Sequence, residues 1–417
     1  MPDDDLEIAA VGSAVTLAAR SRADRFAEVD AALRGLDVRV VGEPGPETTG
    51  PLLLGGFAFA DGRPPAAAGP AGPDWSSFGA GALTLPELLV VRTGGTTTAT
   101  VAYGDDDTGR DRAAVLDRAR RLIGHALRPA DAAADPADRP RTAPVGRGSA
   151  GRDPAYLGLV ARALADIDAG LLDKVVTARA LRLPAPVSAE TLLRRLADRY
   201  RSCAVFAFGR GDATFLGASP ELLARVDGRR VRSAALAGSR PRHADAAADA
   251  ALARELRTSS KERVEHDVVV RGIRAALAGA GVRLDPPEPP SVMSLPAIQH
   301  LRTPVDGVAP ADARALRLVA ALHPTPAVAG TPRAAALAWI ERHEQFDRGW
   351  YAAPVGWATP DGNGEFRVAL RCALLSSGAM TLFAGGGIVA GADPQSELAE
   401  TADKLAAVLD AAAPDGV

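Results

Sequence analysis

Lysine is nearly missing from this chain of 417 residues. Only Lys174, Lys261 and Lys404 occur among 48 basic residues, and all the others are arginines. Together with abundant alanine, glycine and proline, this skew is typical of a GC-rich gene, in which arginine replaces lysine wherever either residue serves. A lysine that remains is then enriched in roles that need an ammonium group able to lose its proton, which a guanidinium cannot do. The alternative is that three surface lysines remained by chance.

Three further absences narrow the class of protein. The two cysteines, Cys203 and Cys372, are far apart and outside any metal-binding spacing, which favours a reducing compartment and two small buried side chains. No apolar run is long enough to span a bilayer, and no apolar signal segment follows the acidic first residues. No basic stripe interleaved with aromatics occurs, and the net charge is −3, which argues against a nucleic-acid partner. The sequence therefore predicts a cytoplasmic protein without membrane contact.

The rest of the composition is that of a globular protein, with 47% hydrophobic and 24% charged residues. Residues 1–127 mix helical and strand patterns, and residues 128–150 form a linker rich in proline, alanine and aspartate. Residues 151–417 carry the informative motifs. Length alone permits one large or two medium domains.

Hydrophobic periodicity predicts the main elements. The first region contains predicted helices over residues 14–34 and 110–127, a buried strand over 52–59, and two strands over 83–92 and 96–103 around a Gly-Gly turn. The last region contains predicted helices over 154–169, 188–199, 259–279 and 395–411, with strands near Val175, Val205, Phe215 and Val231. Consecutive strands beside helices favour an α+β fold with antiparallel sheets.

Two of these helices carry glutamate pairs at the same spacing. Ser259 is a typical helix cap ahead of Glu262 and Glu265, and Glu397 and Glu400 repeat the pattern near the C-terminus. Carboxylates three residues apart share one helix face, so two such helices together offer four carboxylates to a hard cation such as Mg²⁺. Each pair taken alone is more commonly a solvated helix face.

Two other segments suggest chemistry. Gly385-Gly386-Gly387 lies between two apolar runs, where glycine lets backbone N–H groups approach an anion; the alternative is a β-bulge or a tight bend. Lys174 opens a β-branched strand, where burial favours the neutral amine and hence a general-base role. The alternative for Lys174 is a strand-edge lysine that prevents aggregation.

The order of the motifs between residues 155 and 410 resembles the chorismate-utilising enzyme family, which includes isochorismate, salicylate, anthranilate and aminodeoxychorismate synthases. The segments that carry the resemblance are residues 216–223, 236–239, 261–266, 298–301, 323–333, 346–356, 365–371, 384–389 and 397–404. The first third of the chain matches only loosely. So many motifs in one order make a chance match improbable.

The resemblance implies a fold and a set of roles. The fold is α+β, with two stacked antiparallel β-sheets surrounded by helices and the site between the sheets. Lys174 corresponds to the base that activates water, and Glu221 to the general acid. Glu265 and Glu400 correspond to direct ligands of Mg²⁺, with Glu262 and Glu397 acting through water. The substrate-binding residues that the resemblance implies are Gly238, Ser239, His300, Tyr351, Arg371, Gly385, Gly386 and Lys404.

Within the family, the resemblance favours an isomerase that converts chorismate to isochorismate. At the position that corresponds to Lys174, anthranilate synthases have a glutamine, and they receive ammonia from a glutaminase. The aminodeoxychorismate branch carries a lysine where Ala237 stands. The resemblance therefore implies a monomer without a glutaminase subunit. One alternative is a salicylate synthase, which goes on to eliminate pyruvate. Another is a catalytically inactive member that acts as a binding protein, which the intact Lys174, Glu221 and Arg371 argue against.

Overall fold

The structure is a computed structural model that describes residues 6–40, 50–62, 72–103, 117, 118, 120, 121, 124 and 151–413. Apart from those five positions between 117 and 124, the helix predicted over 110–127 lies outside the described residues, as does the whole linker predicted over 128–150. The boundaries of the three predicted regions stay a prediction.

The helices are α1 (Arg25–Arg34), α3 (Pro154–Asp168), α4 (Ala189–Arg199), α5 (Ala246–Thr258), α6 (Ser260–Gly279), α7 (Ala315–Leu322), α8 (Arg333–His343) and α9 (Pro394–Ala412). The four helices predicted in the last region are confirmed as α3, α4, α6 and α9. Their starts follow from local capping, because the side chains of Asp153, Ser188, Ser259 and Asp393 each accept a hydrogen bond from a first-turn N–H group.

The strands of the first third are β1 (Glu7–Val11), β2 (Val15–Ala18), β3 (Leu53–Phe57), β4 (Gly81–Leu85), β5 (Leu88–Thr93) and β6 (Thr96–Val101). The later strands are β7 (Lys174–Pro184), β8 (Ala204–Arg210), β9 (Ala213–Ser219), β10 (Leu222–Asp227), β11 (Arg230–Pro241), β12 (Arg283–Leu284), β13 (Ser291–Ser294), β14 (Ile298–Val308), β15 (Gly330–Thr331), β16 (Pro354–Ala358), β17 (Gly364–Val368), β18 (Cys372–Ser376) and β19 (Ala379–Val389).

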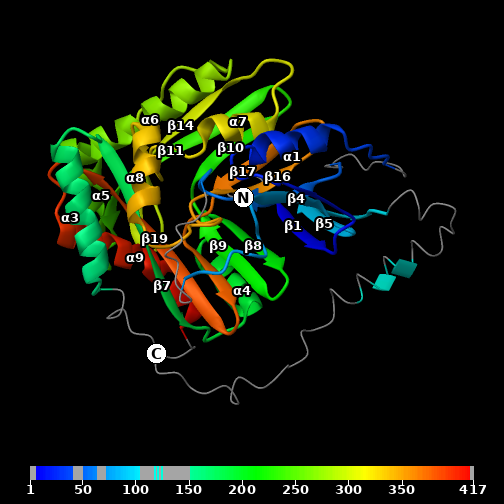
Figure 1. Ribbon diagram of the computed structural model, residues 1–417, viewed down its shortest axis with the longest axis horizontal. Coiled ribbons are helices and arrows are strands. Elements are labelled where there is room, and N and C mark those ends of the chain that lie inside the picture. Colours follow the sequence, from blue (N-terminus) through cyan, green and yellow to red (C-terminus); the bar gives the residue numbers. More distant parts are fainter. Residues whose placement is uncertain are drawn as a thin grey trace.

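The strands of the described chain form two large antiparallel sheets and one small one. The ten-stranded sheet has the order β12-β14-β11-β10-β17-β16-β3-β4-β2, with β13 beside β14, and the six-stranded sheet has the order β15-β7-β19-β18-β9-β8. The small sheet is β1-β5-β6. Helices α1, α6 and α7 pack on the ten-stranded sheet, and α3, α4, α8 and α9 pack on the six-stranded sheet (Figure 1). The predicted α+β fold of two stacked antiparallel sheets is confirmed.

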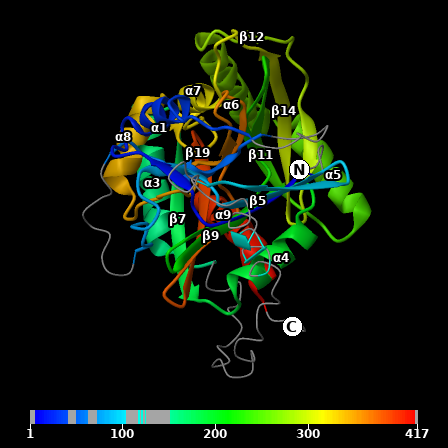
Figure 2. The same ribbon diagram turned by 90° about the vertical axis from the view of Figure 1, so that its right-hand side faces the viewer.

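The second view shows how these layers surround the interior (Figure 2). Helix α5 lies beside β14 at one side of the molecule, and α3 and α8 lie at the other, with β11 and β19 between them. In the described parts of the chain, no helix is both long enough and apolar enough to cross a membrane. Cys203 and Cys372 are both buried and unpaired, as predicted.

Aromatic side chains from distant segments meet in the core. Trp75 lies with its ring 5.1 Å from that of Phe215 on β9, and Phe78 lies 5.0 Å from Trp350. The ring of Tyr351 stacks on Phe383 of β19 at 5.1 Å. Although aromatics make up only 4% of the chain, they join the first third to the six-stranded sheet and to Trp350.

Two predictions in the first third need correction. The helix predicted over 14–34 is wrong in its first half, because Val15–Ala18 form β2 and α1 begins at Arg25. Half-buried and exposed side chains alternate along β2, as expected for a strand. The segment has only four residues, which is too short for hydrophobic spacing to distinguish a strand from a helix. The strand predicted over 83–92 is two strands, since β4 ends at Leu85 ahead of Pro86.

Candidate active site

A cavity of about 80 Å³ brings together most of the predicted site residues. It is lined by segments of both large sheets, by Glu265 in the second turn of α6 and by one face of α9. The predicted residues that line it are Glu221, Gly238, Ser239, Glu265, His300, Tyr351, Arg371, Gly385, Glu400 and Lys404. Lys174, Glu262, Gly386 and Glu397 do not line it in this structure.

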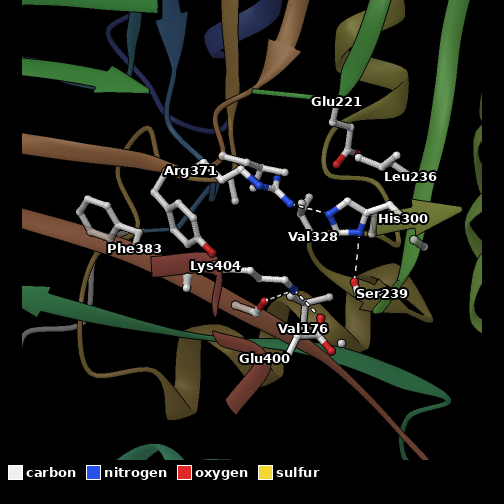
Figure 3. A pocket seen from close by; sticks show the side chains of 18 of the residues that line it. Val176, Glu221, Leu236, Ser239, His300, Val328, Arg371, Phe383, Glu400 and Lys404 are labelled. Atoms are coloured by element: carbon white, nitrogen blue, oxygen red, sulfur yellow. Dashed lines mark hydrogen bonds and ion pairs between the residues drawn. The ribbon is translucent and has the colours of Figure 1, made fainter. Parts of the chain in front are cut away.

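Arg371, His300 and Ser239 form a hydrogen-bonded chain along one wall (Figure 3). Arg371 donates from Nη2 to Nε2 of His300 at 2.6 Å, so Nε2 carries no proton and the proton of His300 is on Nδ1. Nδ1 lies 3.0 Å from Oγ of Ser239 and 3.2 Å from the carbonyl oxygen of Gly238. Burial and the positive charges of Arg371 and Lys404 lower the pKa of His300 to about 3. His300 is therefore a neutral group that orients the Arg371 guanidinium.

The backbone at Arg371 is itself unusual. Its φ of 47° lies in the left-handed region, which residues other than glycine seldom adopt, at a cost of about 1–3 kcal/mol. Arg371 is 6% exposed, between strands β17 and β18. Such conformations persist where the surrounding structure holds them, and they cluster at ligand sites.

Glu221 is a buried carboxyl group with a raised pKa. It lies in the turn between β9 and β10, is 3% exposed, and has its backbone N–H bound to Oγ of Ser219 at 3.2 Å. Burial raises its pKa to about 7, although the charges of Arg371, Lys174 and Lys404 act in the opposite direction. A carboxyl group with this pKa carries a proton for a substantial fraction of the time near neutral pH, as a general acid requires.

Lys174 lies one step behind the cavity wall. It begins β7, is 2% exposed, and its Nζ lies 2.8 Å from Oε1 of Glu265, which does line the cavity. A Cβ atom placed on Gly387, another lining residue, would lie 2.9 Å from Cε of Lys174. The Lys174 amine therefore lies at the edge of the cavity, beside Gly387 and Glu265. Lys174 is buried, so it is not an exposed lysine at a strand edge.

The four predicted metal-binding glutamates gather at the ends of α6 and α9 nearest the cavity, each beside a cation. Glu400 lies 2.8 Å from Lys404, and Glu262 lies 2.6 Å from Arg240. Burial opposes the ionisation of Glu400, but Lys404 outweighs it and holds the pKa of Glu400 below its ordinary value.

Glu397 differs from the other three glutamates. It pairs with Lys261 at 3.8 Å, and its buried Oε2 has no hydrogen-bond partner among the described residues. Burial, followed by the charges of Glu400 and Glu265, raises its pKa. An unpartnered carboxylate oxygen beside two other carboxylates is a site that favours a cation.

No group of three or more His, Cys, Asp or Glu side chains in the described chain is arranged, as it stands, to hold a metal ion. The carboxylates instead bind the ammonium groups of Lys174 and Lys404 and the guanidinium of Arg240. Carboxylate oxygens are ligands that Mg²⁺ prefers. For Mg²⁺ to bind here, the glutamates would have to release these ammonium and guanidinium groups and bind the metal ion instead.

The interpretation of the Gly385–Gly387 triplet as a bulge or a bend between two runs is wrong. All three glycines lie inside β19 and pair in unbroken register with Ala178, Thr177 and Val176 of β7. Their missing side chains make room for other side chains: a Cβ at Gly386 would lie 2.9 Å from Oε2 of Glu397, and one at Gly387 would lie 2.8 Å from Oε1 of Glu265. The triplet thus lets the acidic side chains approach the strand.

Sequence reasoning missed part of the cavity wall. Its apolar side chains include Val176, Leu236, Val328, Leu370 and Phe383, which carry no chemical signature in the sequence. Arg348 also lines the cavity; it stands inside the segment 346–356 that carried the family resemblance, but no role was assigned to it there.

A second, larger cavity of about 280 Å³ lies between α8 and the segment after β3. It contains none of the predicted site residues, and its only residue in common with the first cavity is Arg348. Glu221, Arg371 and Lys404 line the smaller cavity together with Glu265 and Glu400, so the smaller cavity is the candidate active site despite the difference in size.

The chain is similar to known proteins in both sequence and fold. Residues 1–413 match the family model described as chorismate binding enzyme. The salicylate biosynthesis isochorismate synthase of Pseudomonas aeruginosa is 37% identical over 380 residues, which is 87% of this chain and 74% of that protein. The isochorismate synthase MenF of Bacillus subtilis is 34% identical over 366 residues, with the same two coverages. The structure of MenF, the menaquinone-specific isochorismate synthase from Escherichia coli, superposes with a TM-score of 0.75 at 27% identity, covering 99% of this chain and 87% of that one.

Proposed function

This chain belongs to the family of chorismate-binding enzymes, and we propose that it converts chorismate to isochorismate. The observation that carries the proposal is the pairing of a buried carboxylic acid, Glu221, with a buried amine, Lys174, around one cavity that also holds the Arg371 guanidinium. An isomerisation by water exchange needs one group that removes a proton and another that delivers one.

The reaction uses the two groups as follows. Lys174 Nζ takes a proton from a water molecule as its oxygen attacks C2 of the ring. The ring double bond shifts, and the C4 hydroxyl leaves as water after receiving the proton of Glu221. One water is consumed and one released, so the product has the mass of the substrate. The amine lies at the edge of the cavity, with Nζ 2.8 Å from Oε1 of the lining residue Glu265.

The substrate carries two carboxylates, and the cavity offers groups for both. Arg371 and Tyr351 would bind the enolpyruvyl carboxylate, with the planar guanidinium suited to a bidentate contact. Burial raises the pKa of Tyr351, which keeps its hydroxyl a hydrogen-bond donor. Lys404 and the backbone amides of Gly385 and Gly386 would supply further anion contacts. Gly238, Ser239 and His300 would line the ring.

We infer that Mg²⁺ is the resident cation of this enzyme. Glu265 and Glu400 would hold it directly, and Glu262 and Glu397 through water. When bound, Mg²⁺ would supply positive charge to the ring carboxylate of chorismate. The unpartnered Oε2 of Glu397 and the crowding of carboxylates around it support this assignment. A monomeric state, the absence of a glutaminase subunit and a cytoplasmic location stay predictions from the sequence.

The test is to mix purified protein with chorismate and Mg²⁺ and to resolve the products by liquid chromatography with mass detection. We expect a new peak with the mass of chorismate and the retention time of isochorismate, and its loss in the isosteric variant Glu221→Gln. Salicylate with pyruvate, without any added lyase, would instead assign the chain to the salicylate branch. No turnover, with or without ammonium, would refute the proposal and favour an inactive binding protein.

A further inference from the structure

Strand β7, which begins with Lys174, has a complete neighbour on one edge only. Along that edge β19 pairs with it from Lys174 to Pro184. On the other edge, within the described chain, β15 pairs with it at Lys174 and Val175 alone. On the same edge the N–H of Val176 donates to the carbonyl oxygen of Ala329. Beyond that bond, side chains bind the carbonyl oxygen of Val176 and the N–H of Ala178, where a strand would otherwise continue.

Those side chains are Arg348 and Glu344. Arg348 Nη2 donates to the carbonyl oxygen of Val176 at 2.8 Å, and the N–H of Ala178 donates to Oε1 of Glu344 at 2.9 Å. The two side chains also bind each other, with Arg348 Nε 2.8 Å from Oε2 of Glu344 and a second contact between Nη2 and Oε1. They are 3% and 2% exposed, so this is a fully buried ion pair.

The same guanidinium reaches a second segment of the cavity wall. Its Nη1 donates to the carbonyl oxygen of Val328 at 2.9 Å, and its Cζ lies 4.3 Å from the ring centre of Phe59. Val176, Val328 and Arg348 all line the cavity. One planar group therefore joins the wall segment at Val328 to the strand that starts with Lys174.

We propose that Arg348 and Glu344 are positioning residues for the reaction: they hold the start of β7 so that Lys174 lies against Glu265 and the cavity. The inference rests on the proposed function, in which Lys174 is the base. A guanidinium suits this task because its rigid fork serves Val176 and Val328 at once, which a flexible ammonium does not. A buried ion pair adds little net stability compared with apolar residues of similar size, so its main effect here is on geometry.

The experiment separates geometry from stability with two double variants. Glu344→Leu/Arg348→Met removes both charges of the pair. Asp30→Leu/Arg314→Met removes a second largely buried pair between α1 and α7, with Nε of Arg314 2.6 Å from Oδ1 of Asp30 and side chains 12% and 5% exposed. Asp30 also pairs with Arg34 and Arg317, and neither Asp30 nor Arg314 lines the cavity. For each we measure kcat, KM and Tm, and the hydrogen exchange of residues 174–180.

Because an ångström-scale displacement of a reacting group costs about 100-fold in rate, we expect kcat to fall about 100-fold in Glu344→Leu/Arg348→Met with KM within about threefold of wild type. Hydrogen exchange of residues 174–180 should accelerate. The single variant Arg348→Met, which leaves Glu344 buried and unpaired, should have a lower Tm than the double variant but no lower kcat. In the control pair, kcat and the exchange of 174–180 should stay at the wild-type values, whatever the Tm.

The inference is overturned if kcat follows Tm in both double variants, or if residues 174–180 exchange at the wild-type rate without the Glu344–Arg348 pair. If these variants do not fold, Arg348→Lys keeps the charge, and it should lose about tenfold or more in kcat at near wild-type Tm. Wild-type protein that makes no isochorismate would refute the proposed function, while the exchange of residues 174–180 would still decide whether the pair holds the strand.

Discussion

Replacing Glu221 by glutamine should stabilise the protein at alkaline pH while removing its activity. The carboxyl group is 3% exposed, and burial raises its pKa from 4.5 to about 7. Below pH 4.5 the folded and unfolded states both hold the proton. Between pH 4.5 and 7 the unfolded state releases it and the folded state retains it, so wild-type stability falls as the pH rises through this window.

The magnitude follows from the size of the shift. A difference of about 2.5 pKa units corresponds to about 3 kcal/mol lost above pH 7, of which about 1 kcal/mol is already lost at pH 5. Glutamine has nearly the same shape and does not ionise, so Glu221→Gln avoids this loss. The advantage of the variant over wild type should grow by about 2 kcal/mol between pH 5 and pH 8. Any fixed effect of the amide cancels between the two pH values.

The assay is thermal unfolding of wild type and variant at pH 5 and pH 8. For a chain of 417 residues, 2 kcal/mol corresponds to a change of about 2 °C in Tm. Glu288 offers a control, because Glu288→Gln makes the same substitution at an exposed position. In parallel, kcat of Glu221→Gln should fall at least about 100-fold. A Tm difference between Glu221→Gln and wild type that is the same at both pH values would refute the reasoning.

Three further outcomes are expected. Lys174→Ala should abolish isochorismate formation but still bind chorismate in a calorimetric titration, and near-normal turnover would exclude Lys174 as the base. Glu265→Gln and Glu400→Gln should each raise the Mg²⁺ concentration needed for half-maximal rate by about tenfold or more, and unchanged titration curves would contradict the metal assignment. Gly387→Ala should lower kcat because its Cβ would lie 2.8 Å from Glu265 Oε1, whereas Gly209→Ala, which meets nothing within 4 Å, should leave kcat unchanged.

Several parts of the structure were predictable because they depend on neighbours in the chain. The helix α6 begins where Ser259 caps it, and the glutamates at 262 and 265 follow from that start. The order of motifs was enough to predict the α+β fold and the family. Buried Cys203 and Cys372 likewise match the expectation for a cysteine-poor chain.

Predictions failed where a short pattern fits two conformations. Residues 15–18 satisfy both a helical and an alternating spacing, and only pairing with β4 decides that they form a strand. The Gly385–Gly387 triplet has the composition of a turn, yet pairing with β7 keeps it extended. In both segments the partner strand comes from a distant part of the chain, so no local pattern contains the deciding hydrogen bonds.

The sequence by itself determined which residue types are available: three lysines, two glutamate pairs on helices, and a set of motifs in the order of one family. Only the tertiary structure decided which of these side chains meet. It buries Glu221, and this burial raises the pKa of the carboxyl group to about 7. It also places Lys174 behind the cavity wall in contact with Glu265, and Arg348 in contact with Val176 and Val328. The physical reason is that burial and contact between distant residues depend on how the sheets pack, whereas composition and periodicity describe only the chain along its length.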